Sequence, residues 1–438
     1  MRTAKSRILM LTESAFPNDT RVRNEAYALA DAGYKVSVIA LRRYDYEKPT
    51  DIVNGVNVYR IPEVTLFKKT ESRKSWFQIQ LYRIKSAVGY IFEYLYFTFA
   101  CFLLSLYLAI KGRFHTIHIH NPPNTLFVLG AFYRLFGKKF VFDHHDLEPE
   151  LYLSRYGIEK SFIHKVLLLE EKLCLKFANL VIATNESYKE IEIRRGNINP
   201  EKIFVVRNGP NLQTFRPVDG DEELQSMGKK ILVYVGVMGP QDGVDYLLRS
   251  LKELLYSMDR ADFYCVIIGR GDAVEGLKVL RDELDLQDYV RFTGRIPLKD
   301  LLCYLSTAHI CLDPNPSNPL NDYSTWIKVM EYMAFAKPIV SFDLKETRFS
   351  AQDAAIYVTP NDEKEFAKAI VSLMDDAGKR AKMGAFGRRR VLEKLAWHHS
   401  SKNLLLAYES MLPKPTQELY SGEPVMEPTI LSEGQSLT

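Results

Sequence analysis

The apolar and polar positions in the first half of the chain alternate between short buried-strand patterns and amphipathic helices. The run RILMLT (7–12) is almost wholly apolar and predicts a first strand. Asn18, Asp19 and Thr20 are candidate caps for the helix that follows, and Gly33 ends it. The same alternation continues and favours a parallel sheet, with strands expected at 35–41, 116–120, 139–143, 179–184 and 203–206 and helices at 124–136, 161–178 and 185–194.

A break in the alternation separates the two halves. Between residues 208 and 230, Gly, Pro and acidic residues cluster without periodicity, which is typical of a linker. The strand and helix patterns then resume, so we predict an α/β protein with two facing, doubly wound Rossmann-like domains. The later strands are expected at 230–236, 263–269, 289–294, 309–314 and 337–342, and the later helices at 244–255, 362–375, 379–395 and 399–411.

The domain limits follow from the position of the linker. We expect an N-terminal domain over 1–210 and a C-terminal domain over 211–412, whose last helix is able to pack back on the N-terminal domain. Residues 413–438 are rich in Pro, Glu and Ser, and we expect this tail to be disordered.

One segment departs from the amphipathic pattern. The 17 residues between Glu93 and Lys111 carry no charge. That number is at the lower edge of the roughly 17–25 residues that span a bilayer. A basic, aromatic stretch precedes it, so residues 68–110 together have the composition of a membrane-associating segment. Three alternatives remain: a buried helix of a large domain, attachment to an anionic membrane surface, and a transmembrane helix.

The composition narrows the classes of function. The net charge of +4 is too small to indicate a nucleic-acid partner. Residues 1–120 hold 18 Lys and Arg against 10 Asp and Glu, which suits an anionic surface or substrate. The five cysteines show no C-x-x-C spacing, and the N-terminus lacks an apolar stretch of signal-peptide length. We therefore expect a cytoplasmic protein with reduced thiols.

The most informative stretch is NDYSTWIKVMEYMAFAKPIV (321–340), where a polar loop runs into a helix just after the strand 309–314. A helix N-terminus at the carboxyl end of a strand exposes N–H groups that favour phosphate. Lys328 adds positive charge there, and Glu331 has two oxygens that match the two hydroxyls of a ribose. The alternative is an i,i+3 surface ion pair, which accounts for neither the loop nor its apolar neighbours.

Glycines and histidines mark other strand ends. Gly236 and Gly239 follow a strand, although plain tight turns explain them equally well. Five of the nine histidines lie between residues 115 and 145, but their His-x-His and His-His pairs lack the spacing of a four-ligand zinc site, so we assign no metal. His145, followed by Asp146 at a strand end, is a candidate active-site residue.

Six blocks of the sequence, taken in order, resemble family-four retaining glycosyltransferases of the GT-B fold. The similarity covers roughly residues 6–410 and is strongest to bacterial enzymes that build surface polysaccharides on lipid carriers. It implies a nucleotide-diphosphate sugar held mainly by the C-terminal domain and metal-independent transfer with retention of anomeric configuration. The blocks are FPNDTRVRNEAYALADAGYKVSVI, DHHDLEPE, VVRNGPNLQTFRP, YVGVMGPQDGVDYLL, VRFTGRIP and KVMEYMAFAKPIV.

The resemblance also assigns roles to single residues. Glu331 matches the second glutamate of the E-x₇-E motif, which holds the ribose, and His145 matches the strand-end histidine near the transferred sugar. The remaining matches are the backbone near the base at Arg295 and Ile296 and the loop past the diphosphate at Gly236 and Gly239.

The chain departs from the family pattern in three places. Tyr323 replaces the first glutamate of E-x₇-E, and the basic pair of the loop after the first C-terminal strand is missing, with Met238 and Asp242 in that region. The sequence FPNDTR stands in place of the N-terminal diglycine loop. We expect Lys328 to supply the missing positive charge and Asp322 to replace the sugar contact.

The predicted site combines these assignments. It comprises catalytic His145, Asp146 and Lys328; donor-binding Gly236, Gly239, Arg295, Ile296, Asp322, Ser324, Lys328 and Glu331; and acceptor-side Asn18, Asp19, Arg21 and His120.

The predicted function is that of a retaining glycosyltransferase in surface polysaccharide biosynthesis. It would move a sugar from a nucleotide-diphosphate donor to a lipid-linked glycan acceptor, with no cofactor beyond the donor substrate and no nucleic-acid partner. We expect it to lie peripherally at the inner face of the cell membrane. The alternatives are a nucleotide-sugar epimerase of the same fold and a noncatalytic nucleotide- or carbohydrate-binding scaffold, which product analysis with and without acceptor would separate.

Overall fold

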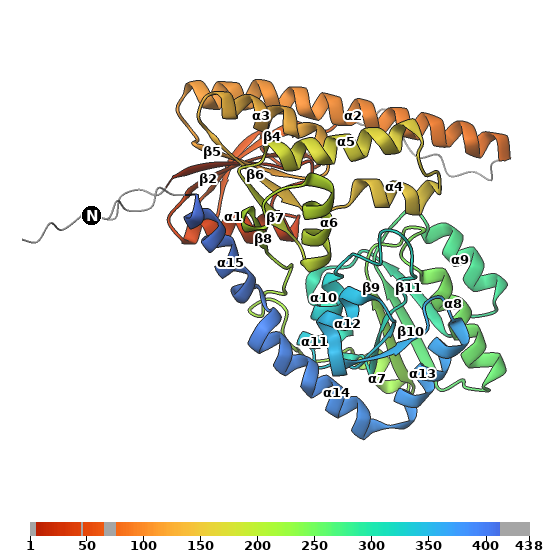
Figure 1. The fold of residues 1–438 in the computed structure, drawn as a ribbon. Coiled ribbons are helices and arrows are strands. Elements are labelled where there is room, and N and C mark those ends of the chain that lie inside the picture. The colour runs from red at the N-terminus through yellow and green to blue at the C-terminus, as the bar shows by residue number, and fades with distance from the viewer. Residues whose placement is uncertain (1–5, 45–46, 65–75, 412–438) are drawn as a thin grey trace, which may run out of the picture.

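The computed structural model describes residues 6–44, 47–64 and 76–411 and contains one large sheet in each half of the chain (Figure 1). The predicted α/β fold with two facing Rossmann-like domains is confirmed. Residues 68–75 of the expected membrane-associating segment and the expected tail 413–438 lie outside the described residues.

The N-terminal sheet has eight strands in the order β3-β4-β2-β1-β5-β6-β7-β8. All neighbouring pairs are parallel except β3 and β4. The strands are β1 (Arg7–Leu11), β2 (Lys35–Arg42), β3 (Thr50–Val53), β4 (Val56–Pro62), β5 (Thr116–His120), β6 (Lys139–His144), β7 (Leu180–Ala183) and β8 (Ile203–Val205).

Helices cover both faces of this sheet, which explains the continuous apolar runs of its strands. Along β1, Leu9 and Leu11 pack with the helices 76–110, 127–135 and 162–177, whereas Ile8 and Met10 pack with the helix 20–31 and the last helix, α15 (Trp397–Ser410). The helices of this half are α1 (Thr20–Asp31), α2 (Trp76–Ile110), α3 (Phe127–Leu135), α4 (Glu148–Tyr156), α5 (Phe162–Phe177) and α6 (Glu186–Gly196).

The antiparallel hairpin β3–β4 was not predicted. Its turn is formed by Asn54 and Gly55, both with positive φ, and the Asn-Gly dipeptide is a strong signal for such a turn. β3 lies at the sheet edge with only half-buried and exposed residues, so it lacks the apolar run used to find the other strands.

The C-terminal sheet has six parallel strands in the order β11-β10-β9-β12-β13-β14. They are β9 (Lys230–Val235), β10 (Phe263–Ile268), β11 (Val290–Gly294), β12 (Ile310–Asp313), β13 (Ile339–Phe342) and β14 (Ala355–Val358). The helices are α7 (Glu222–Ser226), α8 (Val244–Lys252), α9 (Val274–Glu283), α10 (Leu298–Thr307), α11 (Ile327–Ala334), α12 (Lys345–Ala351), α13 (Glu363–Asp375), α14 (Ala377–Arg390) and α15 (Trp397–Ser410).

The chain crosses between the domains twice, and the two crossings touch. A Cβ added to Gly209 would lie 2.0 Å from the carbonyl oxygen of Leu395, so only glycine fits where the linker meets the segment before α15. The amide of Trp397 then donates to the carbonyl of Pro210 (3.1 Å). From there α15 runs along the N-terminal domain beside α1 and β8 (Figure 1).

The loop 314–326, between β12 and α11, also joins the domains. Leu320 is buried in the core of the N-terminal domain, and the Asn185 side chain donates to the carbonyl of Tyr323 (2.8 Å). Ser154 of α4 donates to the side chain of Asn318 (3.0 Å). These contacts hold the carboxyl edges of the two sheets next to each other.

Leu404 and Leu406 on α15 provide a matched test of this packing. Leu404 is fully buried against the N-terminal domain, whereas Leu406 is 55% exposed. We expect Leu404→Ala to lower the free energy of unfolding by roughly 2–5 kcal/mol, because it leaves a cavity between α15 and the sheet. Urea denaturation measures the change. Leu406→Ala should change it by less than about 0.5 kcal/mol, and equal effects would contradict the packing.

Candidate active site

The carboxylate of Asp143 is the centre of a buried polar cluster at the carboxyl end of β6. Arg21 of α1 donates to both of its oxygens, with distances of 2.7 Å (Nε–Oδ2) and 2.5 Å (Nη2–Oδ1). Nδ1 of His120, at the end of β5, lies 2.7 Å from Oδ2. Burial alone would raise the pKa of Asp143, but the Arg21 charge holds it well below its usual range. Asp143 is therefore an anion throughout the neutral pH range.

His145 receives its orientation from Asp143 and Asn121. Its Nδ1 lies 3.2 Å from the Asp143 carboxylate, while its amide donates to Oδ1 of Asn121 (2.9 Å). Asn121 also bonds both the amide and the carbonyl of Asp146, whose side chain is exposed. Burial opposes charge on His145, but the Asp143 carboxylate outweighs it and raises the pKa. Nε2 of His145 has no hydrogen-bond partner among the described residues, so it is available to a ligand.

Four potential metal ligands converge behind this edge, but they do not suit a divalent cation. One ligand atom from each of Glu25, His118, His120 and Asp143 lies within 4.8 Å of the others. The Arg21 guanidinium already lies between the two acids, 3.2 Å from Glu25 and bonded to Asp143. Burial and the neighbouring Asp143 raise the pKa of Glu25 well above its usual range, so Glu25 is neutral and the Arg21 charge compensates Asp143 alone. A further cation would therefore bring uncompensated charge into a buried site.

The acceptor-side assignments of Arg21 and His120 need correction. The two residues are 4% and 1% exposed and both bind Asp143, so neither side chain reaches the surface of the cleft. They position His145 through Asp143 instead. Asp19 caps α1 by accepting from the amide of Val22 (3.1 Å), and Asn18 is exposed just before that helix.

A second buried network surrounds His144. Its Nδ1 lies 3.0 Å from Glu192 and its Nε2 3.5 Å from Glu171, and both carboxyls are fully buried. Glu171 also pairs with Arg195 (3.1 Å). Burial opposes charge on His144, but its bonds to the two glutamates raise the pKa to about 10. His144 is thus a structural imidazolium, whereas the side chain of its neighbour His145 is 15% exposed.

On the C-terminal side, the glycine loops after β9 and β10 pack against each other. A Cβ on Gly269 would lie 1.8 Å from the carbonyl oxygen of Gly236, and Gly269 has φ +141°. The amide of Gly239 donates to the buried Asp242 carboxylate (2.7 Å). The loop with Gly236 and Gly239 was expected to pass the diphosphate, but the amide of Gly239 is already bonded within the loop.

Arg295 and Ile296 follow β11 and differ in their surroundings. Arg295 is exposed and donates to the hydroxyl of Tyr44 across the domain boundary (3.1 Å). Ile296 is half-buried and packs on the apolar cluster beside α10. Arg295 is therefore at the rim of the space between the domains, where its backbone remains available to a base.

The structure revises the role expected for Lys328. The residue is 7% exposed, and its ammonium hydrogen-bonds Asn315 and lies 3.2 Å from Asp313, which is fully buried. The rings of Tyr234 and Trp326 lie over it, with centroids at 4.6 and 5.4 Å. The charge expected to face a diphosphate is instead paired inside the C-terminal domain.

Two other residues assigned to donor binding, Ser324 and Asp322, lie in the loop 314–326. Ser324 is 7% exposed, and its hydroxyl donates to the carbonyl of Leu320 (2.8 Å), so it does not present a free hydroxyl to a donor. Asp322 is half-buried, and its amide donates to the carbonyl of Asn318 (3.1 Å). Its role stays a prediction.

Glu331 lines a narrow pocket that both domains form. The carboxyl is half-buried and has no hydrogen-bond or ion-pair partner among the described residues. Desolvation raises its pKa to about 7. α11 itself begins at Ile327 without a side-chain N-cap, so its first amides are left for another acceptor. The pocket is lined by Thr20, Arg23, Asn24, Asn208, Gly209, Pro210, Asn211, Thr214, Phe215, Ile327 and Glu331.

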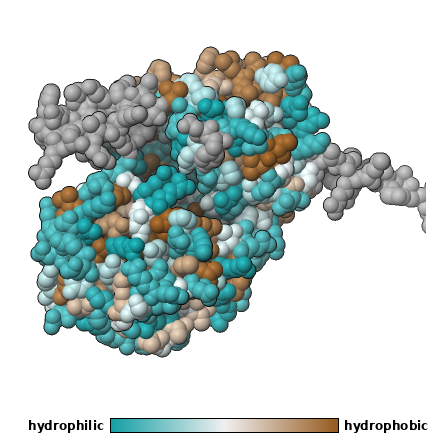
Figure 2. All heavy atoms as spheres, turned by 180° about the vertical axis from the view of Figure 1, so that it is seen from behind, coloured by the Kyte–Doolittle hydropathy of each residue, from teal (hydrophilic) through white to brown (hydrophobic). Residues whose placement is uncertain are grey.

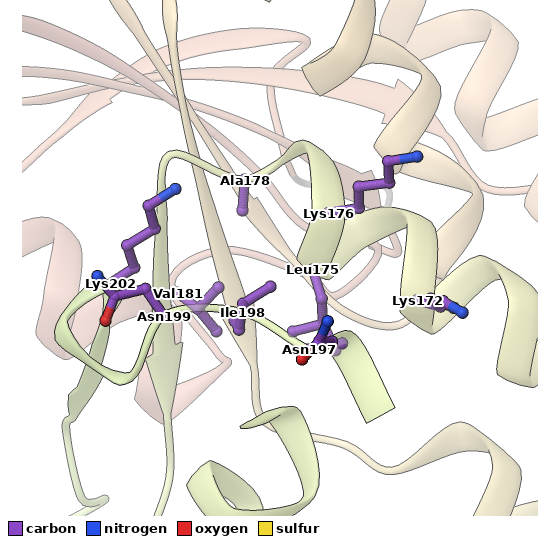
Figure 3. Close-up of a pocket in the computed structure, with 10 residues that line it drawn as sticks. Lys172, Leu175, Lys176, Ala178, Val181, Asn197, Ile198, Asn199 and Lys202 are labelled. Carbon is purple, nitrogen blue, oxygen red and sulfur yellow. The ribbon is translucent and has the colours of Figure 1, made fainter. Parts of the chain in front are cut away.

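A separate hollow on the N-terminal domain has lysines but no converging charge. Lys172, Lys176 and Lys202 line it, and Figure 3 shows their side chains pointing away from one another. Its floor includes the apolar side chains of Leu175 and Ile198. It lies near the start of β7, away from the strand ends that hold His145, so it is not part of the candidate site.

Sequence reasoning missed Asp143, Glu25 and Asn121. Asp143 carried a weak signal, since it is an acid inside the otherwise apolar strand KFVFD. Glu25 lies within an ordinary amphipathic helix, and Asn121 follows a strand next to two prolines, so neither stands out locally.

Comparison with protein families gives two matches that together cover most of the chain. Residues 19–214 match the family described as Glycosyltransferase Family 4, and residues 229–376 match Glycosyl transferases group 1. The first match begins after β1 and covers the other seven strands of the N-terminal sheet, and the second covers all six strands of the C-terminal sheet.

Individual relatives have low sequence identity to this chain but align with it over most of its length. A phosphatidylinositol N-acetylglucosaminyltransferase subunit of Saccharomyces cerevisiae is 22% identical over 307 residues, which is 68% of this chain and 60% of that protein. The chain thus matches only about three fifths of the length of that relative. An uncharacterised glycosyltransferase of Methanocaldococcus jannaschii is 24% identical over 395 residues, 88% of this chain and 92% of the relative.

Solved structures share the fold over nearly the whole chain. The sucrose-phosphate synthase of Thermosynechococcus elongatus aligns with a TM-score of 0.71 and 20% identity, covering 93% of this chain and 99% of its own. HepE of Anabaena, solved in complex with UDP-glucose, aligns with a TM-score of 0.67 and 15% identity, covering 93% and 100%. At these identities the similarity concerns the fold.

The buried position of Lys328 leads to a stability prediction. Lys328→Met should lower the free energy of unfolding by about 3–5 kcal/mol, because it leaves the buried Asp313 carboxylate without its counter-ion. Lys345→Met is the control, since Lys345 pairs with Glu190 on the surface and should contribute less than about 1 kcal/mol. Chemical denaturation of both variants measures the difference. A stable Lys328→Met protein would return this lysine to the role expected from the sequence.

The His144 network predicts a loss of stability at alkaline pH. The pKa of His144 is raised from 6.5 to about 10, so between these two pH values the folded state binds more protons than the unfolded state. Stability is therefore fully present below pH 6.5 and falls as the pH rises toward 10, by up to about 1.4 kcal/mol per pH unit.

Urea denaturation between pH 8 and 9 tests this dependence. His144→Gln should flatten the slope, whereas the same change at the exposed His115 should leave it unaltered. An identical slope in wild type and His144→Gln would show that His144 is not charged in the folded protein.

Proposed function

Because the chain belongs to glycosyltransferase family 4, we propose that it transfers a glycosyl group from a nucleoside-diphosphate sugar to a hydroxyl of a lipid-linked glycan, with retention of anomeric configuration. The observation that supports this most directly is the unpaired carboxyl of Glu331 in a pocket between the domains. A half-buried carboxyl without a hydrogen-bond partner costs free energy unless a ligand satisfies it. Two adjacent ribose hydroxyls fit its two oxygens.

The donor would lie along the carboxyl edge of the C-terminal sheet. Glu331 would bind the ribose, the backbone at Arg295 and Ile296 would contact the base, and the uncapped start of α11 would face the diphosphate. Lys328, paired with Asp313, would act on this end by holding the loop 314–326 and the first turn of α11 in place.

On the facing edge, His145 would meet the transferred sugar. Asp143 fixes its Nδ1 as the protonated nitrogen, and the raised pKa favours a proton on Nε2 as well. Nε2 would then donate to a sugar hydroxyl and to the negative charge that develops as the donor bond breaks. Asp146, exposed beside it, would accept from the sugar or the acceptor.

In the proposed step, the bond between the anomeric carbon and the diphosphate oxygen breaks while the acceptor oxygen attacks from the same face. The acceptor hydroxyl proton passes to the departing diphosphate, so charge and atoms balance without a further reactant. The two domain edges would exclude water, which otherwise hydrolyses the donor.

Relatives support the two substrate classes. HepE was solved with UDP-glucose, and the yeast relative carries a phosphatidylinositol glycosyltransferase name. We propose by analogy that this chain also takes a nucleotide sugar and a lipid-linked acceptor and works at the inner membrane surface. Incubation with labelled nucleotide sugars, with and without lipid-linked glycans, tests the proposal. Epimerised donor without transfer would instead indicate an epimerase, and donor binding without either product a noncatalytic scaffold.

The ribose contact of Glu331 leads to a quantitative prediction. Glu331→Gln keeps the shape but loses the charge and one acceptor, so it should weaken donor binding by roughly 1.5–3 kcal/mol. Isothermal titration with a nucleoside diphosphate and its 2′-deoxy analogue measures the effect. Wild type should prefer the ribose form, and Glu331→Gln should lose most of that preference.

A control and a pH series sharpen the test. Glu283→Gln, on the exposed side of α9, should bind both nucleotides as wild type does. Wild-type affinity should rise with pH through about 7, because the carboxylate form binds the hydroxyls, and Glu331→Gln should not show this rise. A folded Glu331→Gln protein that still discriminates between the two nucleotides would exclude Glu331 as the ribose ligand.

A further inference from the structure

The outer face of α2 is apolar although nothing described covers it. Phe92–Ile110 has the length and composition of a membrane-crossing helix, yet only 22% of its apolar window is buried. The spacing of three or four residues places its exposed large side chains on one stripe. They are 52–79% exposed: Phe92, Leu95, Phe99, Leu103, Tyr107 and Ile110.

The opposite side of α2 is part of the protein core. Phe97, Cys101 and Leu108 are buried with the N-terminal sheet, so the helix lies along the domain rather than standing free of it. Of the three alternatives left by the sequence, a buried helix is contradicted by the exposed stripe. A helix packed on one side and apolar on the other suits a membrane surface better than a bilayer crossing.

The apolar surface continues onto α3 and α5. Leu135 and Phe136 at the end of α3 are 83% and 67% exposed, and Phe162 and Leu169 on α5 are 82% and 55% exposed. Figure 2 shows hydrophobic residues gathered along this edge of the N-terminal domain. An apolar patch of this extent usually marks an interaction surface.

Charge at the margin of this surface favours an anionic bilayer. No Asp or Glu occurs from Tyr94 to Phe142, whereas five Lys and Arg do. The residues are Lys111 and Arg113 after α2, Arg134 in the last turn of α3, Lys138 just before β6 and Lys139 at its start, all of them exposed or half-buried. Basic residues beside an apolar stripe suit anionic headgroups beside acyl chains.

A groove opens from this face between α2, α4 and α5. Its volume is about 500 Å³, and its lining is mostly apolar and aromatic, including Leu151, Tyr152, Ile163 and Val166. That size lies within the range of small-molecule sites. Leu95 belongs both to the groove and to the exposed stripe of α2, so the two surfaces are continuous.

The polar groups of the groove connect it to the candidate site. Glu148 begins α4, two residues after Asp146, and its Oε1 is buried without a hydrogen-bond partner. Burial raises the pKa of Glu148 to about 8, so the carboxyl is largely neutral at pH 7 and suits apolar surroundings. Arg155, at the other end of α4, is exposed and is the one cation of the lining, where an acidic headgroup fits.

We propose that the groove between α2, α4 and α5 binds the hydrocarbon chain of a lipid-linked acceptor, whose phosphate lies near Arg155 while the apolar face of α2, α3 and α5 lies on the membrane. This rests on the proposed function and adds where the acceptor's lipid is held. The hydrocarbon chain of the acceptor enters the groove from the bilayer beside Leu95. The polar head of the same molecule lies along α4, toward the sheet edge that carries His145 and Asp146.

Photo-labelling tests the site with the full-length protein. The probe is a polyprenyl phosphate carrying a diazirine in its chain, in vesicles of phosphatidylcholine with and without phosphatidylglycerol. We expect cross-links on α4 and α5, at Leu151, Tyr152, Ile163 and Val166. Val166→Trp, which fills the groove, should lower this labelling roughly tenfold and leave vesicle binding unchanged. Leu167→Trp is a second blocking variant if the first is not stably folded.

A face variant separates the groove from the membrane surface. Phe99→Ser and Leu103→Ser, on the outer stripe but outside the groove, should together weaken binding to the phosphatidylglycerol vesicles. Detergent-dispersed probe should still label the groove of this variant. Labelling confined to the outer stripe, or labelling unchanged by both tryptophan variants, would overturn the proposal. A wild-type dimer that Phe99→Ser dissociates would overturn it too, since a second copy would then cover the face.

Donor titration distinguishes this inference from the proposed function. If groove labelling behaves as expected but no nucleotide sugar binds, the lipid site stands and the glycosyl-transfer proposal fails. If nucleotide sugars bind and transfer to a water-soluble acceptor occurs equally in wild type and Val166→Trp, while groove labelling is absent, the lipid site fails and the transferase stands.

Discussion

The ion pair between Arg21 and Asp143 determines the arrangement of the N-terminal side of the cleft. The two residues are 122 positions apart and both are buried, and the guanidinium also donates to the carbonyl of Val206 (3.0 Å) and the side chain of Asn208 (2.7 Å). One cation therefore ties α1, β6 and the start of the interdomain linker together. A buried charge tolerates no missing partner, so this geometry is strongly determined. His145 has its orientation because Asp143 is held there.

The same linker sets how the two domains meet. Just after β8, the linker accepts a hydrogen bond from Arg21 at the carbonyl of Val206. It then contacts the segment before α15 at Gly209 and lines the pocket of Glu331. The loop 314–326 makes the second connection, with Leu320 inside the N-terminal core. A ligand at Glu331 would thus contact elements of both domains. The pocket of Glu331 therefore depends on these contacts between the domains.

Helix α4 links two different environments. Its first turn follows the polar edge of β6, where charges are paired and fixed, while its side faces an apolar groove that opens on α2. A substrate with a polar head and a hydrocarbon chain has this same division.

The sequence by itself determined the two-domain α/β fold and most of its elements. Parallel strands covered on both faces must be continuously apolar, and amphipathic helices must repeat every three to four residues, so both can be read locally. Strands such as β1 and β6 were therefore predicted close to their observed limits. The hairpin β3–β4 was missed because β3 lies at the sheet edge with half-buried and exposed residues, and β4 alternates buried and half-buried positions instead of forming a continuous apolar run. The Asn54–Gly55 turn was the remaining signal.

The sequence also pointed to His145, which follows the end of β6, and to Glu331, in the second turn of α11, because each lies in a recognisable block. Only the tertiary structure decided which charges are free. Lys328 looked available until Asp313 and Asn315, on the preceding strand and loop, were placed beside it. Arg21 and His120 looked exposed until Asp143 joined them. Local periodicity fixes where a side chain points within its element, but the partner that neutralises a charge comes from another element, and folding alone brings the two together.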